Sequence, residues 1–165
     1  MLGASNKFET IRFLLKEGSR FDYRTFAGGS AVHHAVESDD ADPKMLRFLL
    51  RHISAILGND KEKFKAILND RGQIHTLKWK AIYFAAKLIY RSSLSQSSVI
   101  RYLAMECGAP PLYYAVQHGD IEIVKILLEN GANPLVKNDL GLNALEICEK
   151  FGPYPKITAL LQNYL

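Results

Sequence analysis

The clearest pattern of apolar and polar positions lies in residues 111–134, PLYYAVQHGDIEIVKILLENGANP. Apolar residues come at helical spacing both before and after the pair Gly119-Asp120. Glycine permits a tight turn there, Asp120 is a suitable N-cap for the second helix, and Gly131 is a suitable residue to end it. The pattern therefore predicts two short helices joined by a tight turn.

This pattern recurs after 33 residues. The helix start at 111–115 falls on 144–148, Gly119 falls on Gly152, and the apolar run 124–128 falls on 157–161. A fixed period of this length is typical of stacked helical repeats, in which each unit buries its apolar face against its neighbours.

Weaker copies precede these two. Residues 8–18 have the apolar spacing of a second helix, 25–30 fit a turn, and 30–35 fit the start of a first helix. Asp42-Pro43 is a good N-cap and N1 pair for the helix that follows. Together they predict a partial repeat and a complete one before residue 59.

The middle of the chain is irregular. Residues 80–85 fit the start of a first helix and 99–108 fit a second helix, with a polar loop at 91–98 between them. Residues 61–76 match neither, although Phe64, Ile67 and Leu68 indicate an extra short helix. We expect one irregular repeat with an insertion here.

Residues 110–161 resemble two consecutive ankyrin repeats. The motif Thr-Pro-Leu-His-x-Ala corresponds to residues 110–115, and Gly-x-x-x-x-Val-x-x-Leu-Leu-x-x-Gly-Ala corresponds to 119–132. The turn motif Asp-x-x-Gly-x-Thr corresponds to 138–143. The resemblance implies an all-α solenoid of about four repeats in one domain, with approximate boundaries 1–22 (partial), 23–58, 59–109 (irregular, with the insertion), 110–137 and 138–165.

Two departures from the family pattern stand out. Only one residue separates Gly108 from Pro110, so the projecting turn before that repeat is predicted to be missing. The chain also begins close to a second helix, which leaves the apolar side of Ile11 and Leu14 without a cap. Either the sequence is a fragment of a longer chain, which we favour, or residues 1–6 form a fragmentary first helix.

Composition sets the broad class. The 165 residues are 48% hydrophobic and 23% charged, which is ordinary for a globular domain. Two distant cysteines without a CxxC pair favour a reducing compartment, so we expect an intracellular, cytoplasmic protein. The apolar runs are far short of the roughly 20 residues that a membrane helix needs, so we expect no membrane span, and we expect a monomer. Ankyrin repeats also occur in effectors that intracellular bacteria deliver into host cells, and the irregular repeats suit that origin without establishing it.

The net charge of +4 is concentrated in the middle of the chain, because residues 60–101 hold nine Lys and Arg against three Asp and Glu. Such a region could bind nucleic acid or an anionic surface, although a solvated helix face is the plainer interpretation. Trp79, Tyr83 and Phe84 lie among these lysines and could stack on bases, but core packing is expected.

No catalytic motif is present, and we expect no enzyme activity, no cofactor and no metal. His33 stands where the family places a histidine that bonds to nearby backbone, and its neighbour His34 points elsewhere on a helix. Cys107 and Cys148 fall at helix positions expected to be buried, and Cys148 replaces a small packing residue.

The resemblance implies that another protein binds the concave face, which is formed by the first helices and the turn tips. We favour a protein over nucleic acid, and a third possibility is the recognition arm of a larger enzyme or effector. Exposed aromatic side chains are good interface anchors, which singles out Phe26 and Phe151, with burial of both by the irregular repeats as the alternative. The predicted partner-binding residues are Phe26, His34, Glu37, Ser38, Lys87, Gln117, His118, Asp139, Leu140, Lys150 and Phe151.

Overall fold

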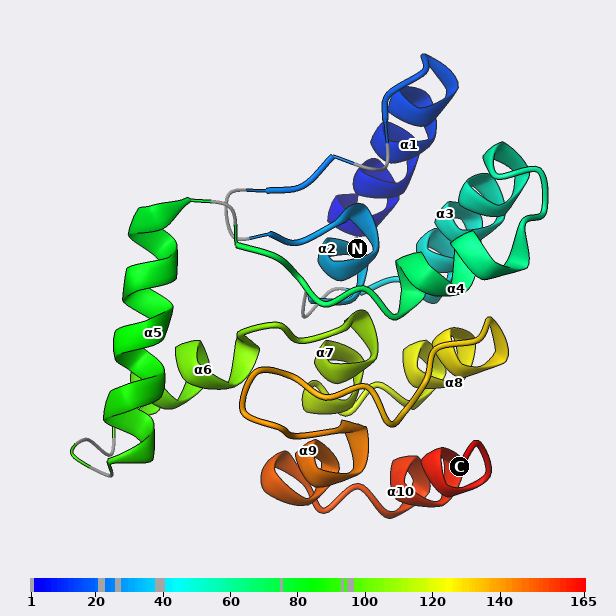
Figure 1. Cartoon of the computed structure of the whole chain (residues 1–165). Coiled ribbons are helices and arrows are strands. Elements are labelled where there is room, and N and C mark those ends of the chain that lie inside the picture. The colour runs from blue at the N-terminus through cyan, green and yellow to red at the C-terminus, as the bar shows by residue number, and fades with distance from the viewer. Residues whose placement is uncertain are drawn as a thin grey trace.

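The computed structural model describes residues 2–20, 23–25, 28–37, 41–74, 76–92, 94 and 97–165, with the backbone alone at 2–8 and 102. Within these residues every regular element is an α-helix (Figure 1). The helices are α1 (Leu2–Lys16), α2 (Ala31–Glu37), α3 (Pro43–Ile56), α4 (Lys61–Leu68), α5 (Leu77–Arg91), α6 (Ser98–Glu106), α7 (Pro111–Gln117), α8 (Ile121–Glu129), α9 (Ala144–Phe151) and α10 (Pro155–Gln162).

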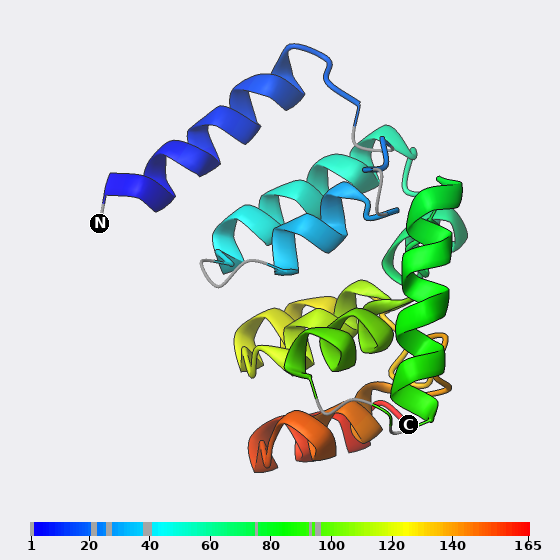
Figure 2. The same ribbon diagram turned by 90° about the vertical axis from the view of Figure 1, so that its left-hand side faces the viewer.

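Three helix pairs form a two-layered stack, which is an all-α solenoid as predicted. The first helices α2, α7 and α9 follow one another in one layer, and the second helices α3, α8 and α10 follow one another in the other (Figures 1 and 2). Completely buried side chains such as Leu46, Leu127 and Ile147 fill the space between the layers. Each pair thus buries its apolar face against the next.

Local sequence signals define these helices as expected. The Asp42 carboxylate accepts a hydrogen bond from Lys44 N (2.9 Å), and Asp120 accepts from the amides of Glu122 and Ile123. Asn143 forms a capping box with Glu146, whose carboxylate accepts from Asn143 N. These caps satisfy amide groups that a helix leaves without intrahelical partners.

The structure differs from the predicted repeat boundaries at 59–109. Helices α5 and α6 pack mainly against each other, and α2 contacts α7 directly. The two helices are therefore not a repeat inside the stack. They form a hairpin beside it, which we call the inserted hairpin (α5 and α6), and Figure 2 shows α5 running alongside the stacked helices.

The turn before α7, which was predicted to be missing, is instead the place where the inserted hairpin enters and leaves the stack. The chain leaves along residues 69–74 and returns along 107–110, between the turn before α2 on one side and the turn before α9 on the other. Gly28 approaches Gln73 so closely that a Cβ would lie 2.1 Å from the Gln73 carbonyl oxygen, and Asp139 N donates to Cys107 O at 2.8 Å. The short spacing from Gly108 to Pro110 is the end of an insertion and not a deletion.

Helix α1 packs loosely at one end of the stack. A single helix covers residues 2–16, so no separate first helix is formed by 1–6 among the described residues. Leu15 is buried and Ile11 is partly buried, but Leu14 is 45% exposed and Phe13 is 60% exposed. The predicted lack of cover therefore holds for Leu14 and only in part for Ile11.

Candidate functional site

The predicted binding residues are distributed over four parts of the fold. Phe26 and Ser38 lie outside the described residues. The others occupy the first helices or their ends (His34, Glu37, Gln117, His118, Lys150, Phe151), helix α5 (Lys87) and the turn before α9 (Asp139, Leu140).

A charged cluster lies at the end of α2. His34 Nδ1 and a Glu37 carboxylate oxygen are 3.1 Å apart. This hydrogen bond raises the pKa of His34 and lowers the pKa of Glu37, and the nearby charge of His118 lowers the Glu37 pKa further. Three of the predicted residues therefore lie near one another at the end of α2, and His34 and His118 are both exposed.

His33 has the structural role that was predicted for it. Its Nδ1 accepts from the Ser30 amide (3.2 Å), which leaves Nε2–H to donate to Ala109 O at 3.1 Å. Burial lowers the pKa of His33, so the neutral ring that these bonds require is favoured. The side chain ties α2 to the segment that returns from the inserted hairpin.

The inserted hairpin covers part of the concave face. Tyr83 from α5 and Glu106 from α6 line a small cavity together with His34, Glu37 and Tyr114 from the stack. Burial raises the pKa of Tyr83 to about 12. The hairpin therefore lies next to the side of α2 that carries His34 and Glu37.

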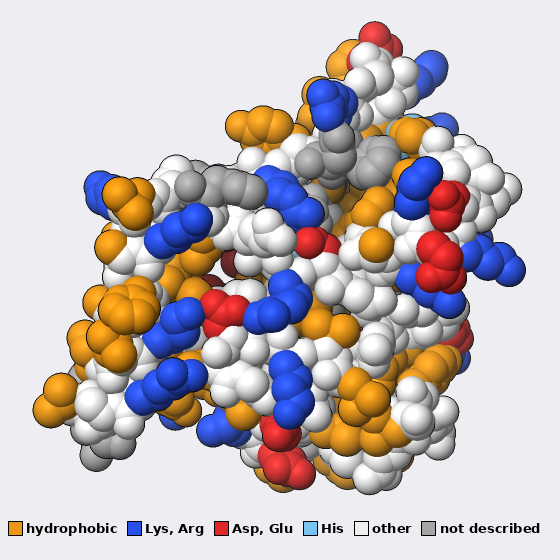
Figure 3. Space-filling model, viewed as in Figure 1, with side chains coloured by type: hydrophobic (Ala, Val, Ile, Leu, Met, Phe, Trp, Pro, Cys, Tyr) orange, Lys and Arg blue, Asp and Glu red, His pale blue; other side chains and the backbone are white. Residues whose placement is uncertain are grey.

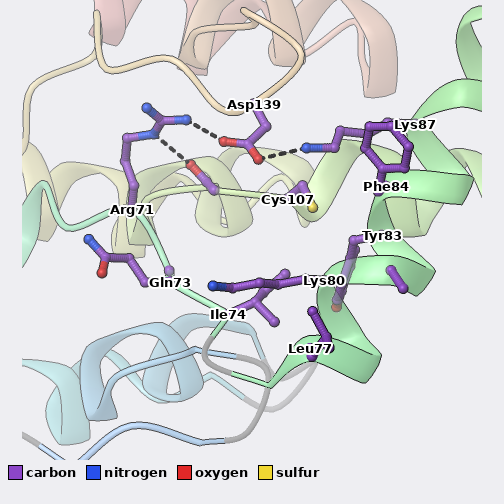
Figure 4. A pocket seen from close by; sticks show the side chains of 13 residues that line it. Arg71, Gln73, Ile74, Leu77, Lys80, Tyr83, Phe84, Lys87, Cys107 and Asp139 are labelled. Carbon is purple, nitrogen blue, oxygen red and sulfur yellow. Dashed lines mark hydrogen bonds and ion pairs between the residues drawn. The ribbon is translucent and has the colours of Figure 1, made fainter.

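A second cluster surrounds Asp139, at the tip of the turn before α9. One carboxylate oxygen lies 2.9 Å from Lys87 Nζ and the other lies 2.5 Å from an Arg71 guanidinium nitrogen (Figure 4). Arg71 also donates to Gly108 O at 3.3 Å. The sequence singled out Lys87 and Asp139 separately, but it gave no indication that they meet, and Arg71 was noticed only as part of the basic region.

Two of the predicted binding residues have limited exposure. Leu140 and Phe151 are partly buried and pack against the core. Phe151 is therefore not a free aromatic anchor. Lys150 beside it is exposed, and its Nζ lies 3.5 Å from the Tyr90 hydroxyl of α5.

The aromatic residues of α5 are divided. Tyr83 is buried as predicted and its ring lies 6.0 Å from that of Trp79, which is partly buried. Phe84 is 60% exposed, so core packing was the wrong interpretation for it. Its side chain lines an open hollow between α5 and residues 71–74, so it stays exposed to solvent.

The basic residues of 60–101 lie mostly on α4 and α5, with Arg71 between these helices and Arg101 on α6. On α4, Lys63 lies 3.1 Å from Asp60 and Lys65 lies 3.6 Å from Glu62, so part of its charge is paired locally. Binding of nucleic acid by this region stays a prediction.

The two cysteine thiols are buried. Cys107 and Cys148 are free thiols and both are buried, and burial raises the pKa of Cys107 to about 11. In the described ranges no group of three or more His, Cys, Asp and Glu side chains is arranged to hold a metal ion. Within the same ranges no helix has both the length and the apolar character required to cross a membrane.

Comparisons with known proteins agree with the fold. A family model described as ankyrin repeats (3 copies) matches residues 52–138 and 88–164. An ankyrin repeat protein of Acanthamoeba polyphaga mimivirus is 24% identical over 160 residues, which cover 97% of this chain and 19% of the relative. A palmitoyltransferase of Lachancea kluyveri is 26% identical over 118 residues, covering 67% of this chain and 16% of that protein.

Human transient receptor potential cation channel subfamily A member 1 is 26% identical over 157 residues, covering 77% of this chain and 14% of the channel. The chain thus spans less than a fifth of the length of each of these relatives. What they share with it is the repeat region, and the family match extends over more than half of the chain. The chain belongs to the ankyrin repeat family.

Proposed function

We propose that this chain is a protein-binding module whose partner contacts the concave face at the ends of the first helices, around His34, His118 and Lys150. Ankyrin repeats generally mediate protein–protein interactions, and this chain is a member of the family. The observation that carries the choice of face is that these three side chains are exposed at or near the ends of the first helices, whereas residues such as Val36, Val116 and Ile147 of the same helices are buried.

Different residues of the same first helix serve packing and binding. On α7, residues 111–116 are all buried, and they pack against the neighbouring helices. His118 at the end of the same helix is exposed, so it can vary without loss of packing. A surface of this kind on a rigid stack binds with little cost in ordering entropy, because the scaffold is already in its bound form.

In this proposal the chain binds and does not catalyse. The raised pKa of Cys107 supports this, because a nucleophilic cysteine needs an accessible thiolate at neutral pH. The palmitoyltransferase relative is an enzyme by name, but this chain covers only 16% of it.

The test is affinity capture with wild-type chain, a concave-face variant (His118→Glu with Lys150→Glu) and a control variant on the opposite layer (Lys156→Glu on α10). Captured proteins are identified by mass spectrometry, and far-UV circular dichroism verifies that all three chains are folded. We expect the concave-face variant to lose a partner that the control retains. Retention by both variants, or loss only by the control, would show that the face is wrongly assigned.

A further inference from the structure

Helix α5 presents an apolar stripe that nothing in the described chain covers. Its inward side carries the buried Tyr83. On the other side, positions 77, 81, 84 and 88 follow the spacing of one helix face, and all four are exposed (Leu77 83%, Phe84 60%, Leu88 52%, and Ala81). A continuous row of large exposed apolar side chains marks an interaction surface, whereas single ones need no explanation.

Leu77, Ala81 and Phe84 of this stripe line one wall of a groove. A cavity of about 730 Å³ lies between α5 and the extended residues 71–74, with Cys107, Gly108 and Asp139 at its base. We call it the α5 groove. Figure 4 shows Lys80 reaching from α5 toward the 71–74 segment and Lys87 turned toward Asp139. Figure 3 shows apolar side chains along the edge formed by α5, beside a hollow flanked by basic side chains.

The charge of the groove is positive. Arg71, Lys80 and Lys87 line it with the single carboxylate of Asp139. Asp139 is shared between Arg71 and Lys87. Within the part of the chain that the structure describes, Lys80 has no ion-pair partner. Positive groups next to apolar side chains complement a ligand in which carboxylates alternate with large apolar groups.

We propose that the α5 groove binds a short acidic segment of another protein, with an apolar side chain of that segment against Leu77 and Phe84 and its carboxylates near Lys80 and Lys87. The groove includes none of His34, His118 and Lys150, on which the proposed function depends, so this inference goes beyond that function. A peptide fits better than a membrane, because Lys87 is partly covered beside Asp139 in the hollow, where a flat layer of headgroups reaches it poorly. It fits better than RNA, because Phe84 is the only exposed aromatic ring among the described residues that line the groove.

The experiment begins with a library of short random peptides displayed on phage and selected on the immobilised wild-type chain. The enriched sequences are synthesised with a fluorescein label, and their Kd is measured by fluorescence anisotropy. We expect enrichment of peptides with a net negative charge and at least one large apolar side chain.

Matched variants then locate the site. Lys80→Glu and, separately, Phe84→Ser should each weaken binding by about tenfold or more, because they remove the charge or the apolar wall. Asp139→Asn should strengthen binding, by roughly threefold, because it leaves Arg71 and Lys87 available to the peptide. Lys156→Glu on α10 changes the net charge as Lys80→Glu does, far from the groove, and should have little effect. Circular dichroism confirms folding of each variant.

The proposal is overturned if selection yields no acidic preference, or if neither Lys80→Glu nor Phe84→Ser alters the Kd. Two further assays test the other classes of ligand: co-sedimentation with phosphatidylcholine vesicles containing phosphatidylserine, and binding of labelled oligouridine. The proposal is also overturned if the chain binds either ligand, Phe84→Ser abolishes that binding, and the selected peptides bind no better than scrambled controls. A chain that selects no acidic peptide but loses its captured partner in the His118→Glu, Lys150→Glu variant would leave the concave-face proposal standing.

Discussion

The stack and the inserted hairpin are both helical and lie side by side, yet they are stabilised differently. In the stack, α8 is bounded by α3, α7 and α10, and five of its nine residues are buried. In the hairpin, α5 has fifteen residues, of which only Tyr83 and Ala86 are buried. The comparison shows that a helix with comparable apolar content can be core or surface according to how many neighbours it has. The stack provides the scaffold, and the hairpin provides exposed surface.

The largest expected difference comes from removing the same side chain in each region. Leu127→Ala in α8 should destabilise the protein by about 2–5 kcal/mol, because it leaves a cavity around a side chain with 0% exposure. Leu88→Ala in α5, where the side chain is 52% exposed, should cost less than about 1 kcal/mol. Urea unfolding followed by circular dichroism measures both, and equal costs would mean that α5 is core.

Hydrogen exchange compares the regions without any substitution. Amides of α5 and α6 should exchange faster than those of α7 and α8 by about tenfold or more, because helices with few buried contacts open locally before the whole domain unfolds. Mass spectrometry of peptic fragments from the native chain gives both rates. Equal protection in the two regions would show that hairpin and stack form one cooperative unit.

Removing a helix cap should also cost more stability in the stack than in the inserted hairpin. Asn143 caps α9 through the amides of Leu145 and Glu146, so Asn143→Ala should cost about 1 kcal/mol. Thr76 stands at the same position of α5 without a side-chain capping bond, so Thr76→Ala should change stability by much less. Thermal unfolding of the two variants tests this, and a larger loss for Thr76→Ala contradicts the assignment of the caps.

The smallest effect concerns the junction between stack and hairpin, where His33 bonds to Ala109. The folded-state pKa of His33 is below the ordinary 6.5. The contribution of His33 to folding stability is therefore complete above pH 6.5 and is lost as the pH falls below 6.5. His34 has a raised pKa in the folded state. Its contribution to folding stability is therefore present below pH 6.5 and is lost as the pH rises through the folded-state pKa.

Two substitutions separate these contributions. His33→Gln should reduce the loss of Tm between about pH 7.5 and pH 5.5, by no more than about 2–4 °C. His34→Gln should have the opposite sign and increase that loss. Scanning calorimetry of the wild type and both variants at each pH measures the effect, and shifts of the same sign in both variants would contradict the pKa directions.

Much of the stack could be predicted from sequence because its signals are local. The caps Asp42 and Asp120 and the helix end at Gly131 each depend on a few neighbouring residues. The site was less predictable. Arg71 and Lys87 lie 68 and 52 positions from Asp139, and no spacing rule connects them. The sequence left the exposure of Phe151 open, because that exposure depends on which neighbouring elements pack against it.

The sequence alone determined the repeat type, because a period of 33 with its turn glycines specifies a helix pair that must bury one face. Only the tertiary structure decided that α5 and α6 stand outside the stack and that the turn at 69–110 is extended instead of absent. The reason is that α5 has apolar residues around most of its circumference. Periodicity records which side chains are apolar, but it does not record which of them find a neighbour.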